Sequence, residues 1–293
     1  MAILTRILAP VEFSPRCQGA IRYATALARH FRSEIVLLHV VLPPATLYGL
    51  SEAAAYTSAP DLQAEVVNDR KARLAAFAAE DLRDLPVTRV VLEGDPAHAI
   101  VQYAHKFGAS LIVMPTHAHG PFRRFLLGSV TAKVIHDAEC PVWTGPHLED
   151  AGTQPSAGFH RILCALDLGI DSRAILGWAA AFARGYGSEL AIVHAIPMST
   201  TRLGGVYFDP DWSIHVAADA RRCICDMQAD LNAPGEISVP VGDPSHAIAE
   251  TAANWKADLL IIGRGHRTGV LGRLRTHTYA ILRESPCPVV ATP

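Results

Sequence analysis

The sequence lacks any hydrophobic run long enough to cross a membrane. No apolar stretch approaches the ~20 residues that a membrane-spanning helix needs. The first residues, from Met1 to Arg6, lead straight into a strand-like segment and lack the parts of a signal peptide. We therefore expect a cytoplasmic protein that does not contact membranes.

An excess of charge of one sign is also missing. The formal net charge is -2, and charged residues make up 18% of the chain, whereas hydrophobic residues make up 50%. A surface that binds nucleic acid is usually basic, so this balance argues against a nucleic-acid partner. The hydrophobic fraction favours a well-packed protein over a disordered one. Local basic segments such as Arg123-Arg124 still allow a small anion to bind.

Motifs for metals, disulfides and phosphoryl transfer are absent as well. The six cysteines include no CxxC pair, and most lie in apolar segments, where cysteine acts as a small hydrophobic residue. His117 and His119 form a His-x-His pair, but no third ligand follows nearby, so we predict no metal site. Neither a pair of carboxylates nor a P-loop lysine beside a magnesium-binding carboxylate is evident, so we predict no catalytic residues.

What the sequence does contain is a long internal repeat. Arg6-Ile7-Leu8 returns as residues 161–163, and Cys140-Pro141-Val142 returns as residues 287–289. Residues 93–100 (Glu-Gly-Asp-Pro-Ala-His-Ala-Ile) return with two differences as residues 241–248 (Val-Gly-Asp-Pro-Ser-His-Ala-Ile). The order of the matches is kept, and the offset changes only between them. A period of this length is that of a whole domain and not of a solenoid repeat.

Strand-like and helix-like segments alternate in each copy. In the first copy, apolar runs predict strands at residues 6–11, 35–41, 87–92, 111–115 and 141–144. Helices are predicted after Ser14-Pro15, over residues 61–84, after Pro96 and from about Ser129. The second copy predicts strands at residues 162–166, 190–196, 236–241, 259–263 and 288–291. This alternation indicates an α/β fold of two tandem doubly wound domains, each with a five-stranded parallel sheet.

The repeat also sets the domain boundaries. We predict one domain over residues 1–147, a linker over residues 148–158 and a second domain over residues 159–293. Residues 145–158 are rich in Pro, Gly, Ala and Ser, which is typical of a linker. In a doubly wound sheet, ligands bind beyond the carboxyl ends of the strands, so the ends of the first two strands and the loop after the fourth should meet at one rim.

Several motifs resemble the universal stress protein (UspA-like) family. They are residues 10–14 (Pro-Val-Glu-Phe-Ser), residues 114–120 (Met-Pro-Thr-His-Ala-His-Gly), residues 127–130 (Leu-Gly-Ser-Val), both Gly-Asp-Pro segments and both Cys-Pro-Val segments. The resemblance covers essentially the whole chain as two tandem domains. It implies a Rossmann-like, adenine-nucleotide alpha-hydrolase-like fold that either binds an adenine nucleotide or has lost that ability. The family's nucleotide-binding members carry Gly-x2-Gly-x9-Gly-Ser/Thr after strand four and an Asp near the end of strand one.

In the first copy, the resemblance implies a site for the base near Pro10, Val11, Glu12 and Val40, with Met114 as a further wall. The phosphates would lie near His117, Gly128, Ser129 and Val130, because glycines admit a close backbone approach and a helix start attracts anions. However, Pro115 and Ala118 replace the first two glycines of the motif, and Glu12 replaces the Asp.

In the second copy, the motif departs from the family pattern in the opposite way. Asp167, Gly263 and Gly265 match it, and Thr276 stands where the family has Ser or Thr. Arg275 occupies the position of the glycine before it and places a long side chain at the phosphate pocket. We therefore expect a weaker site there.

Three functions follow from this reading. The first is a regulatory stress-response protein that binds ATP, ADP or AMP, with Mg²⁺ as an accompanying ion, in the first domain. The second is a nucleotide-free interaction module in which both sites have degenerated. The third, ranked last, is a slow ATPase. The resemblance also implies that the fifth strands (residues 141–144 and 288–291) pair within one chain, which would cover two exposed sheet edges. It further implies that the chain forms a homodimer.

Overall fold

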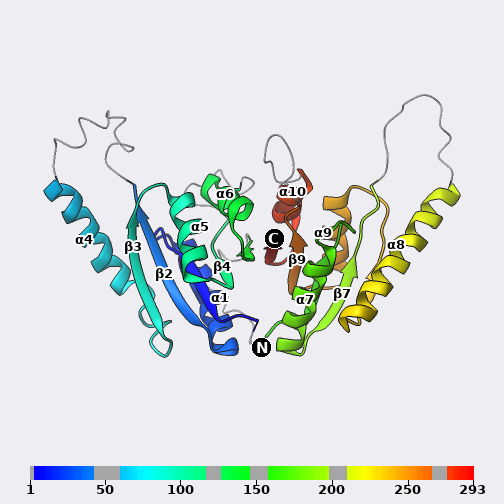
Figure 1. Ribbon diagram of the computed structural model, residues 1–293, viewed down its shortest axis with the longest axis horizontal. Helices are drawn as coiled ribbons and strands as arrows, with labels where there is room; N and C mark the ends of the chain where they lie inside the picture. The colour runs from blue at the N-terminus through cyan, green and yellow to red at the C-terminus, as the bar shows by residue number, and fades with distance from the viewer. Residues whose placement is uncertain (1–2, 43–59, 117–126, 146–157, 198–209, 266–275) are drawn as a thin grey trace, which may run out of the picture. The chain divides into compact units, whose positions relative to one another are not determined.

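A computed structural model describes residues 3–42, 60–116, 127–145, 158–197, 210–265 and 276–293 (Figure 1). The chain divides into two compact units, residues 1–155 and 156–293, which we call domain 1 and domain 2. Most of the predicted linker lies outside the described residues, so its bounds stay a prediction. Within the part of the chain that the structure describes, no helix is both long and apolar enough to span a membrane.

Domain 1 alternates strands and helices as the sequence predicts. Its elements are β1 (Arg6–Pro10), α1 (Pro15–Phe31), β2 (Glu34–Val41), α4 (Pro60–Ala76), β3 (Val87–Glu93), α5 (Pro96–Phe107), β4 (Leu111–Val113), α6 (Ser129–Asp137) and β5 (Val142–Thr144). The strands form a parallel sheet in the order β3-β2-β1-β4-β5. The predicted doubly wound fold is confirmed.

Domain 2 repeats this arrangement. Its elements are β6 (Arg161–Ala165), α7 (Ser172–Tyr186), β7 (Glu189–Val193), α8 (Pro210–Leu231), β8 (Glu236–Ser238), α9 (Pro244–Asn254), β9 (Leu259–Gly263), α10 (Thr276–Glu284) and β10 (Val289–Thr292). The strands are again parallel, in the order β8-β7-β6-β9-β10. Beyond β8 only an isolated bridge joins Ile196 to Val241, because Pro240 has no N–H with which to continue the ladder.

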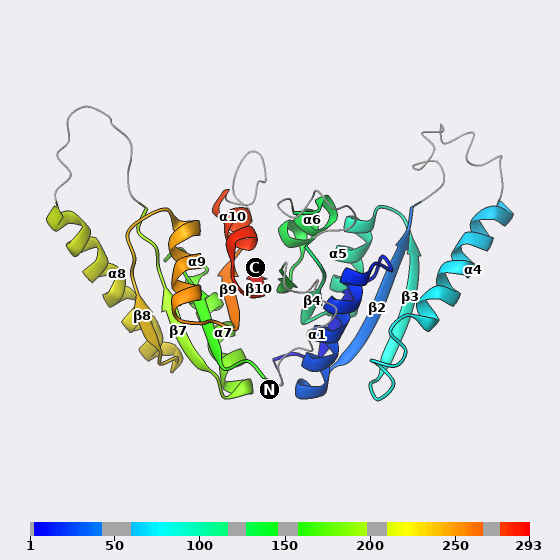
Figure 2. The same ribbon diagram turned by 180° about the vertical axis from the view of Figure 1, so that it is seen from behind.

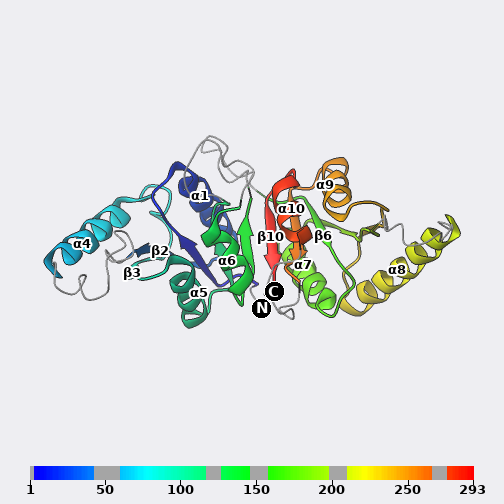
Figure 3. The same cartoon turned by 90° about the horizontal axis from the view of Figure 1, so that it is seen from above.

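Helices cover both faces of each sheet. In domain 1, α1 and α5 lie on opposite faces (Figure 3), and α6 packs beside α5. In domain 2, α9 packs beside α10 and α7 beside α8. Helix α4 lies beside β3, and helix α8 lies on the β8 side of the sheet of domain 2 (Figure 2). Because both faces are covered, the central strands are apolar on both sides, as in the wholly buried run from Ile7 to Ala9.

In both domains, a polar side chain accepts hydrogen bonds from two backbone N–H groups at the start of the first strand. In domain 1, the Ser110 hydroxyl accepts hydrogen bonds from the backbone N–H groups of Thr5 and Arg6, at 2.9 and 3.0 Å. In domain 2, the Asp258 carboxylate accepts from the N–H groups of His160 and Arg161, at 2.6 and 2.8 Å. A different side chain thus satisfies the same backbone donors in each copy, which supports duplication of one ancestral domain.

One predicted helix is too long. The sequence predicts a helix over residues 61–84, but α4 ends at Ala76, and Ala78 adopts a left-handed backbone with φ 51°. The chain turns there because Phe77 packs edge-on against Phe13, with ring centroids 5.6 Å apart, and Leu82 is buried. Tertiary packing therefore overrides the local helical pattern after Ala76.

Candidate functional site

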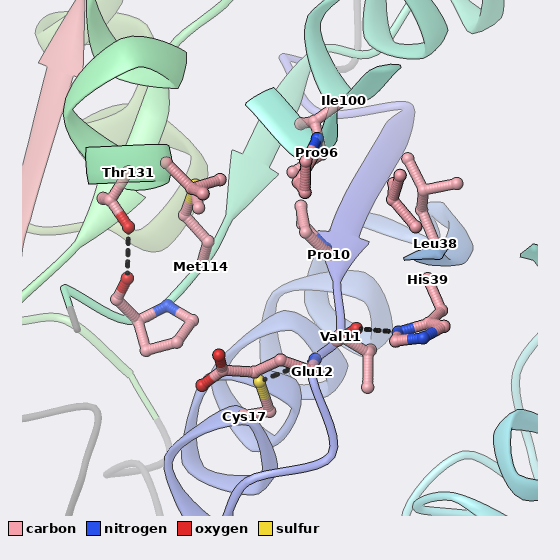
Figure 4. Close-up of a pocket in the computed structure, with 13 residues that line it drawn as sticks. Pro10, Val11, Glu12, Cys17, Leu38, His39, Pro96, Ile100, Met114 and Thr131 are labelled. Atoms are coloured by element: carbon pink, nitrogen blue, oxygen red, sulfur yellow. Dashed lines mark hydrogen bonds between the residues drawn. The ribbon is translucent and has the colours of Figure 1, made fainter. Parts of the chain in front are cut away.

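The candidate site lies where the strand order of domain 1 reverses. β1 pairs with β2 on one side and with β4 on the other, so the chain leaves the carboxyl end of β1 at a topological switch point. Crevices at such points are where open α/β sheets bind ligands. A cavity of about 170 Å³ lies at this position (Figure 4).

The walls of the cavity are mostly apolar. Figure 4 shows Pro10 and Val11 at the end of β1, with Met114 to one side and His39 to the other. Further apolar contacts come from the ends of β2 and β4 and from the first turns of two helices; they are Leu38, Val40, Pro115, Pro96, Ile100 and Val130. Such a wall suits the flat faces of an aromatic ring better than it suits a charged group.

Glu12 and Cys17 supply polar atoms at the floor of the cavity. The Ser14 hydroxyl donates to Glu12 Oε1 at 2.8 Å, and the Glu12 N–H points at Cys17 Sγ at 3.3 Å. Burial raises the pKa of the Cys17 thiol, and the neighbouring Glu12 carboxylate adds to this effect. Cys17 therefore stays a neutral thiol near pH 7 and acts as part of the wall rather than as a nucleophile.

His39 closes the cavity on the β2 side. Its Nδ1 lies 2.7 Å from the Val11 carbonyl oxygen, which can only accept, so Nδ1 carries the proton. Burial lowers the pKa of His39, and the Arg70 and Arg73 guanidinium groups lower it further, against the opposing effect of the bond to Val11. His39 is therefore neutral at pH 7. His194 makes the matching bond to the Leu166 carbonyl in domain 2, at 2.9 Å.

Three helices of domain 1 contribute residues of their first turns to the cavity. At α1, the Ser14 side chain accepts a hydrogen bond from the Cys17 N–H, and at α5 the Asp95 side chain accepts from the His98 N–H. At α6 the N-cap residue is Gly128, which has no side chain with which to cap the helix. The N-cap residue therefore gives the first-turn N–H groups of α6 no side-chain hydrogen bond.

The start of α6 is nevertheless held firmly in place. The Gly128 N–H donates to the Thr116 carbonyl at 2.8 Å, and the buried Thr131 hydroxyl donates to the Pro115 carbonyl at 3.0 Å. Gly128 has φ -61°, which any residue can adopt, so the backbone does not require glycine at this position. What glycine provides here is the absence of a side chain beside the helix start.

The structure brings most of the predicted domain 1 residues together. The cavity lining includes all of the following predicted residues: Pro10, Val11, Glu12, Val40, Met114 and Val130. Gly128 and Ser129 adjoin it as the cap and first residue of α6, and Ser129 is exposed. His117 lies outside the described residues. The structure shows where these residues lie, and the binding roles assigned to them stay predictions.

Sequence reasoning did not assign Cys17, His39 or Thr131 to the site. His39 and Cys17 are polar interruptions in apolar patterns, but nothing in the sequence shows that both side chains face the same cavity. Because His39 lies in an apolar run of the sequence, the pattern there predicts a hydrogen-bonded core residue. Its hydrogen bond is present, but the ring is only part-buried because it borders the cavity.

The corresponding residues of domain 2 are arranged differently. The exposed Asp167 accepts hydrogen bonds at Oδ1 from the Gly169 N–H, at 2.8 Å, and from the Ser172 hydroxyl, at 3.3 Å. The carboxylate thus helps to shape the turn that leads into α7. Thr276 is the first residue of α10, and Arg275 lies outside the described residues.

The two glycines of domain 2 serve different purposes. A Cβ at Gly263 would lie only 2.5 Å from Cδ1 of Ile175, so this glycine makes room for a side chain of α7. The matching residues in domain 1 are Pro115 and Ala20. In domain 2 the larger residue of this pair is therefore on the helix, whereas in domain 1 it follows the fourth strand. Gly265, with φ 80°, has a left-handed backbone that favours glycine.

Among the described residues, no group of three or more His, Cys, Asp or Glu side chains is placed to hold a metal ion. His117 and His119 lie outside that part of the chain, so the structure does not test the predicted lack of a metal site.

Comparisons with known proteins agree with this architecture. The chain is 31% identical over 137 residues to universal stress protein MJ0531 of Methanocaldococcus jannaschii, covering 47% of this chain and 79% of the relative. A universal stress protein from Archaeoglobus fulgidus has the same fold, with a TM-score of 0.67 and 20% identity over 98% of this chain and 95% of the other. A protein from Pseudomonas aeruginosa, described as a putative universal stress protein, gives 0.65 and 18% over 99% and 93%.

The family assignment rests on both halves of the chain. The model of the universal stress protein family matches residues 4–144 and again residues 158–293, which together make up most of the sequence. This chain is therefore a tandem two-domain member of the universal stress protein family.

Proposed function

We propose that this chain is a stress-response protein that binds an adenine nucleotide in domain 1 and acts as a regulator rather than as an enzyme. The observation that carries this proposal is the start of α6, a helix without a side-chain cap whose first turn borders an apolar cavity. An apolar slot next to an open helix start matches the two halves of a nucleotide, a flat base and an anionic phosphate.

In this proposal the base occupies the cavity between Val11, Val40 and Met114. The first-turn N–H groups of α6 and the Ser129 hydroxyl receive the phosphate, and the Glu12 carboxylate accepts hydrogen bonds from ribose hydroxyls. A di- or triphosphate would bring Mg²⁺ with it. The names of the relatives support the stress-response part of the proposal.

One observation favours the alternative, a nucleotide-free interaction module. The cavity measures about 170 Å³, whereas pockets for drug-sized ligands usually measure ~300–1,000 Å³. A volume of this size leaves room for a base, and the rest of a nucleotide would lie outside the cavity. Domain 2, where Arg275 replaces the glycine of the motif, is the weaker candidate under either proposal.

The test is direct binding of nucleotide to the full chain. Mass spectrometry of the purified, denatured protein should detect AMP, ADP or ATP, or a thermal shift should follow addition of ATP. Gly128→Arg copies the residue of domain 2 and should abolish the shift, because the guanidinium fills the anion position. Ser129→Ala should weaken binding by about ten- to a hundredfold, the usual effect of losing one hydrogen bond to a charged group.

Thr276→Ala in domain 2 is the matched control for Ser129→Ala and should leave nucleotide affinity unchanged. Binding that survives Gly128→Arg would place the site elsewhere. A protein that carries no nucleotide and shows no shift with ATP, ADP or AMP would favour the interaction module instead.

A further inference from the structure

Helix α4 buries few of its side chains against domain 1. Among residues 63–76, whose side chains the structure describes, only Leu74 belongs to the buried class. Arg89 of β3 donates to the Leu74 carbonyl at 3.1 Å. The corresponding helix of domain 2, α8, buries Ala220, Ile224 and Met227. Elements that bury few side chains open at a low free-energy cost, so we expect α4 to detach from the sheet at a low cost.

A stack of three side chains connects α4 to the cavity wall. Arg73 of α4 lies over the ring of Phe13, with its guanidinium carbon 4.5 Å from the ring centroid. The Phe13 ring in turn packs against His39, with centroids 4.5 Å apart, and Phe77 contacts Phe13 edge-on. We call Arg73, Phe13 and His39 the His39 stack. It joins a residue that lines the cavity to the last turn of α4.

The domains differ at this stack although their backbones agree. Phe13 has φ 64° and Leu168, its counterpart in domain 2, has φ 57°, so both copies make the same left-handed turn after the first strand. Leucine has no π face for a cation or a histidine ring. The turn is therefore a feature of the fold, whereas the aromatic stack belongs to domain 1 alone.

Charge makes the stack sensitive to protonation. In its neutral form, the His39 ring packs against Phe13 while two arginines, Arg70 and Arg73, lie near it on α4. A proton on the ring would add a third positive charge in a part-buried position. Arg70 contacts Asp69 at 3.1 Å, which neutralises it only in part because the Asp69 side chain is largely exposed.

We propose that the His39 stack is an acid-operated latch, in which protonation of His39 repels Arg70 and Arg73 and loosens α4 from domain 1. Arg70 and Arg73 lower the pKa of His39, and no carboxylate among the described residues is found to raise it. Glu12, on the loop after β1, receives the Ser14 hydroxyl, and Glu93 at the end of β3 receives the Gln63 amide. Cys17 of α1 remains neutral, because burial raises the pKa of its thiol.

Hydrogen–deuterium exchange of the full chain without nucleotide tests this latch, so the result does not depend on the proposed function. Peptides from residues 63–76 are compared at about pH 7.5 and at a pH below the midpoint of the His39 titration, which NMR should locate below the usual histidine pKa of ~6.5 because burial lowers the pKa of His39. Rates are corrected for the pH dependence of chemical exchange. In the wild type, protection of α4 should fall about two- to fivefold at the lower pH, the size expected for repulsion between partly exposed charges.

His39→Asn keeps a side-chain donor for the Val11 carbonyl but cannot take up the proton, so its α4 protection should be the same at both pH values. His194→Asn in domain 2 is the matched control and should keep the wild-type acid response of α4. Full acid response in His39→Asn, or none in the wild type, would overturn the proposal.

A second variant covers the case in which His39→Asn fails to fold. Arg73→Gln removes one of the two opposing charges and should raise the midpoint of the His39 titration followed by NMR. An unchanged midpoint in Arg73→Gln would also overturn the latch.

Discussion

Asp95 and Asp243 occupy the same place in the two domains and perform the same task with different partners. Asp95 accepts from the His98 N–H and lies 3.4 Å from Lys133, and together these contacts lower the pKa of its carboxyl. The Ser245 hydroxyl and then the His246 N–H lower the pKa of Asp243. Each side chain replaces hydrogen bonds that the helix start cannot make within the helix.

We predict that Asp95→Ala and Asp243→Ala each destabilise their domain by about 1 kcal/mol, the usual effect of deleting an N-cap. Because the pKa of each carboxyl is lowered on folding, the stabilisation is present above about pH 3.9, the unfolded value, and is lost as pH falls through the folded value. Urea unfolding between neutral and acidic pH should show the difference between wild type and variant shrinking with acid.

The control at this scale is Asp219→Ala. Asp219 forms an ion pair with Arg222 in which both side chains are largely exposed, so its replacement should change stability by less than about 0.5 kcal/mol. A difference for Asp95→Ala that persists undiminished in acid would show that its effect does not come from the ionised cap.

At the scale of elements, two glycines of domain 2 show how packing decides whether the chain tolerates a larger residue. Gly235 precedes β8, and a Cβ there would lie 2.3 Å from the Leu190 carbonyl oxygen of the neighbouring strand. Gly177 lies inside α7, and its nearest outside neighbour would be Leu231 Cδ2 at 3.9 Å. The first glycine permits close approach of two strands, whereas the second only costs helix stability.

The same substitution should therefore have opposite effects at these two positions. Gly235→Ala should destabilise domain 2 by about 1–3 kcal/mol, because backbone atoms must move apart. Gly177→Ala should stabilise it by about 0.5–1 kcal/mol, because alanine is the better helix former. Urea unfolding followed by circular dichroism measures both, and destabilisation by Gly177→Ala would show that the space beside α7 is tighter than the structure indicates.

At the scale of the whole molecule, each domain has its own sheet and its own buried strands, as residues 7–9 and 162–164 show. A unit of this size buries enough apolar surface to fold by itself. The pairing of the two fifth strands and the homodimer, both implied by the family resemblance, stay predictions, as does the cytoplasmic location.

We predict that residues 1–155 and 156–293, produced separately, each fold with native-like circular dichroism and a cooperative unfolding transition. If their fifth strands pair, mixing the two halves should yield a 1:1 complex on size-exclusion chromatography with light scattering. Folded halves that do not associate would contradict the strand pairing but not the fold.

The residue pattern alone was enough to predict the fold. The repeat, the apolar runs and the Ser14-Pro15 helix start are local signals, and strand and helix periodicity depend on neighbours in the sequence. They also placed Pro10, Val11 and Met114 at one rim, because the carboxyl ends of parallel strands meet there. What they did not show was the end of α4 at Ala76, where a contact between Phe77 and Phe13 decides the backbone.

Periodicity in the amino-acid sequence by itself thus determined the order of elements and the rim that carries the candidate site, and the resemblance of several motifs indicated the family. Only the tertiary structure decided that His39 and Cys17 share a cavity, that Gly263 makes room for Ile175, and that Arg73 stacks on Phe13. The physical reason is distance: these side chains are far apart in the chain, and only packing of one element on another brings them into contact.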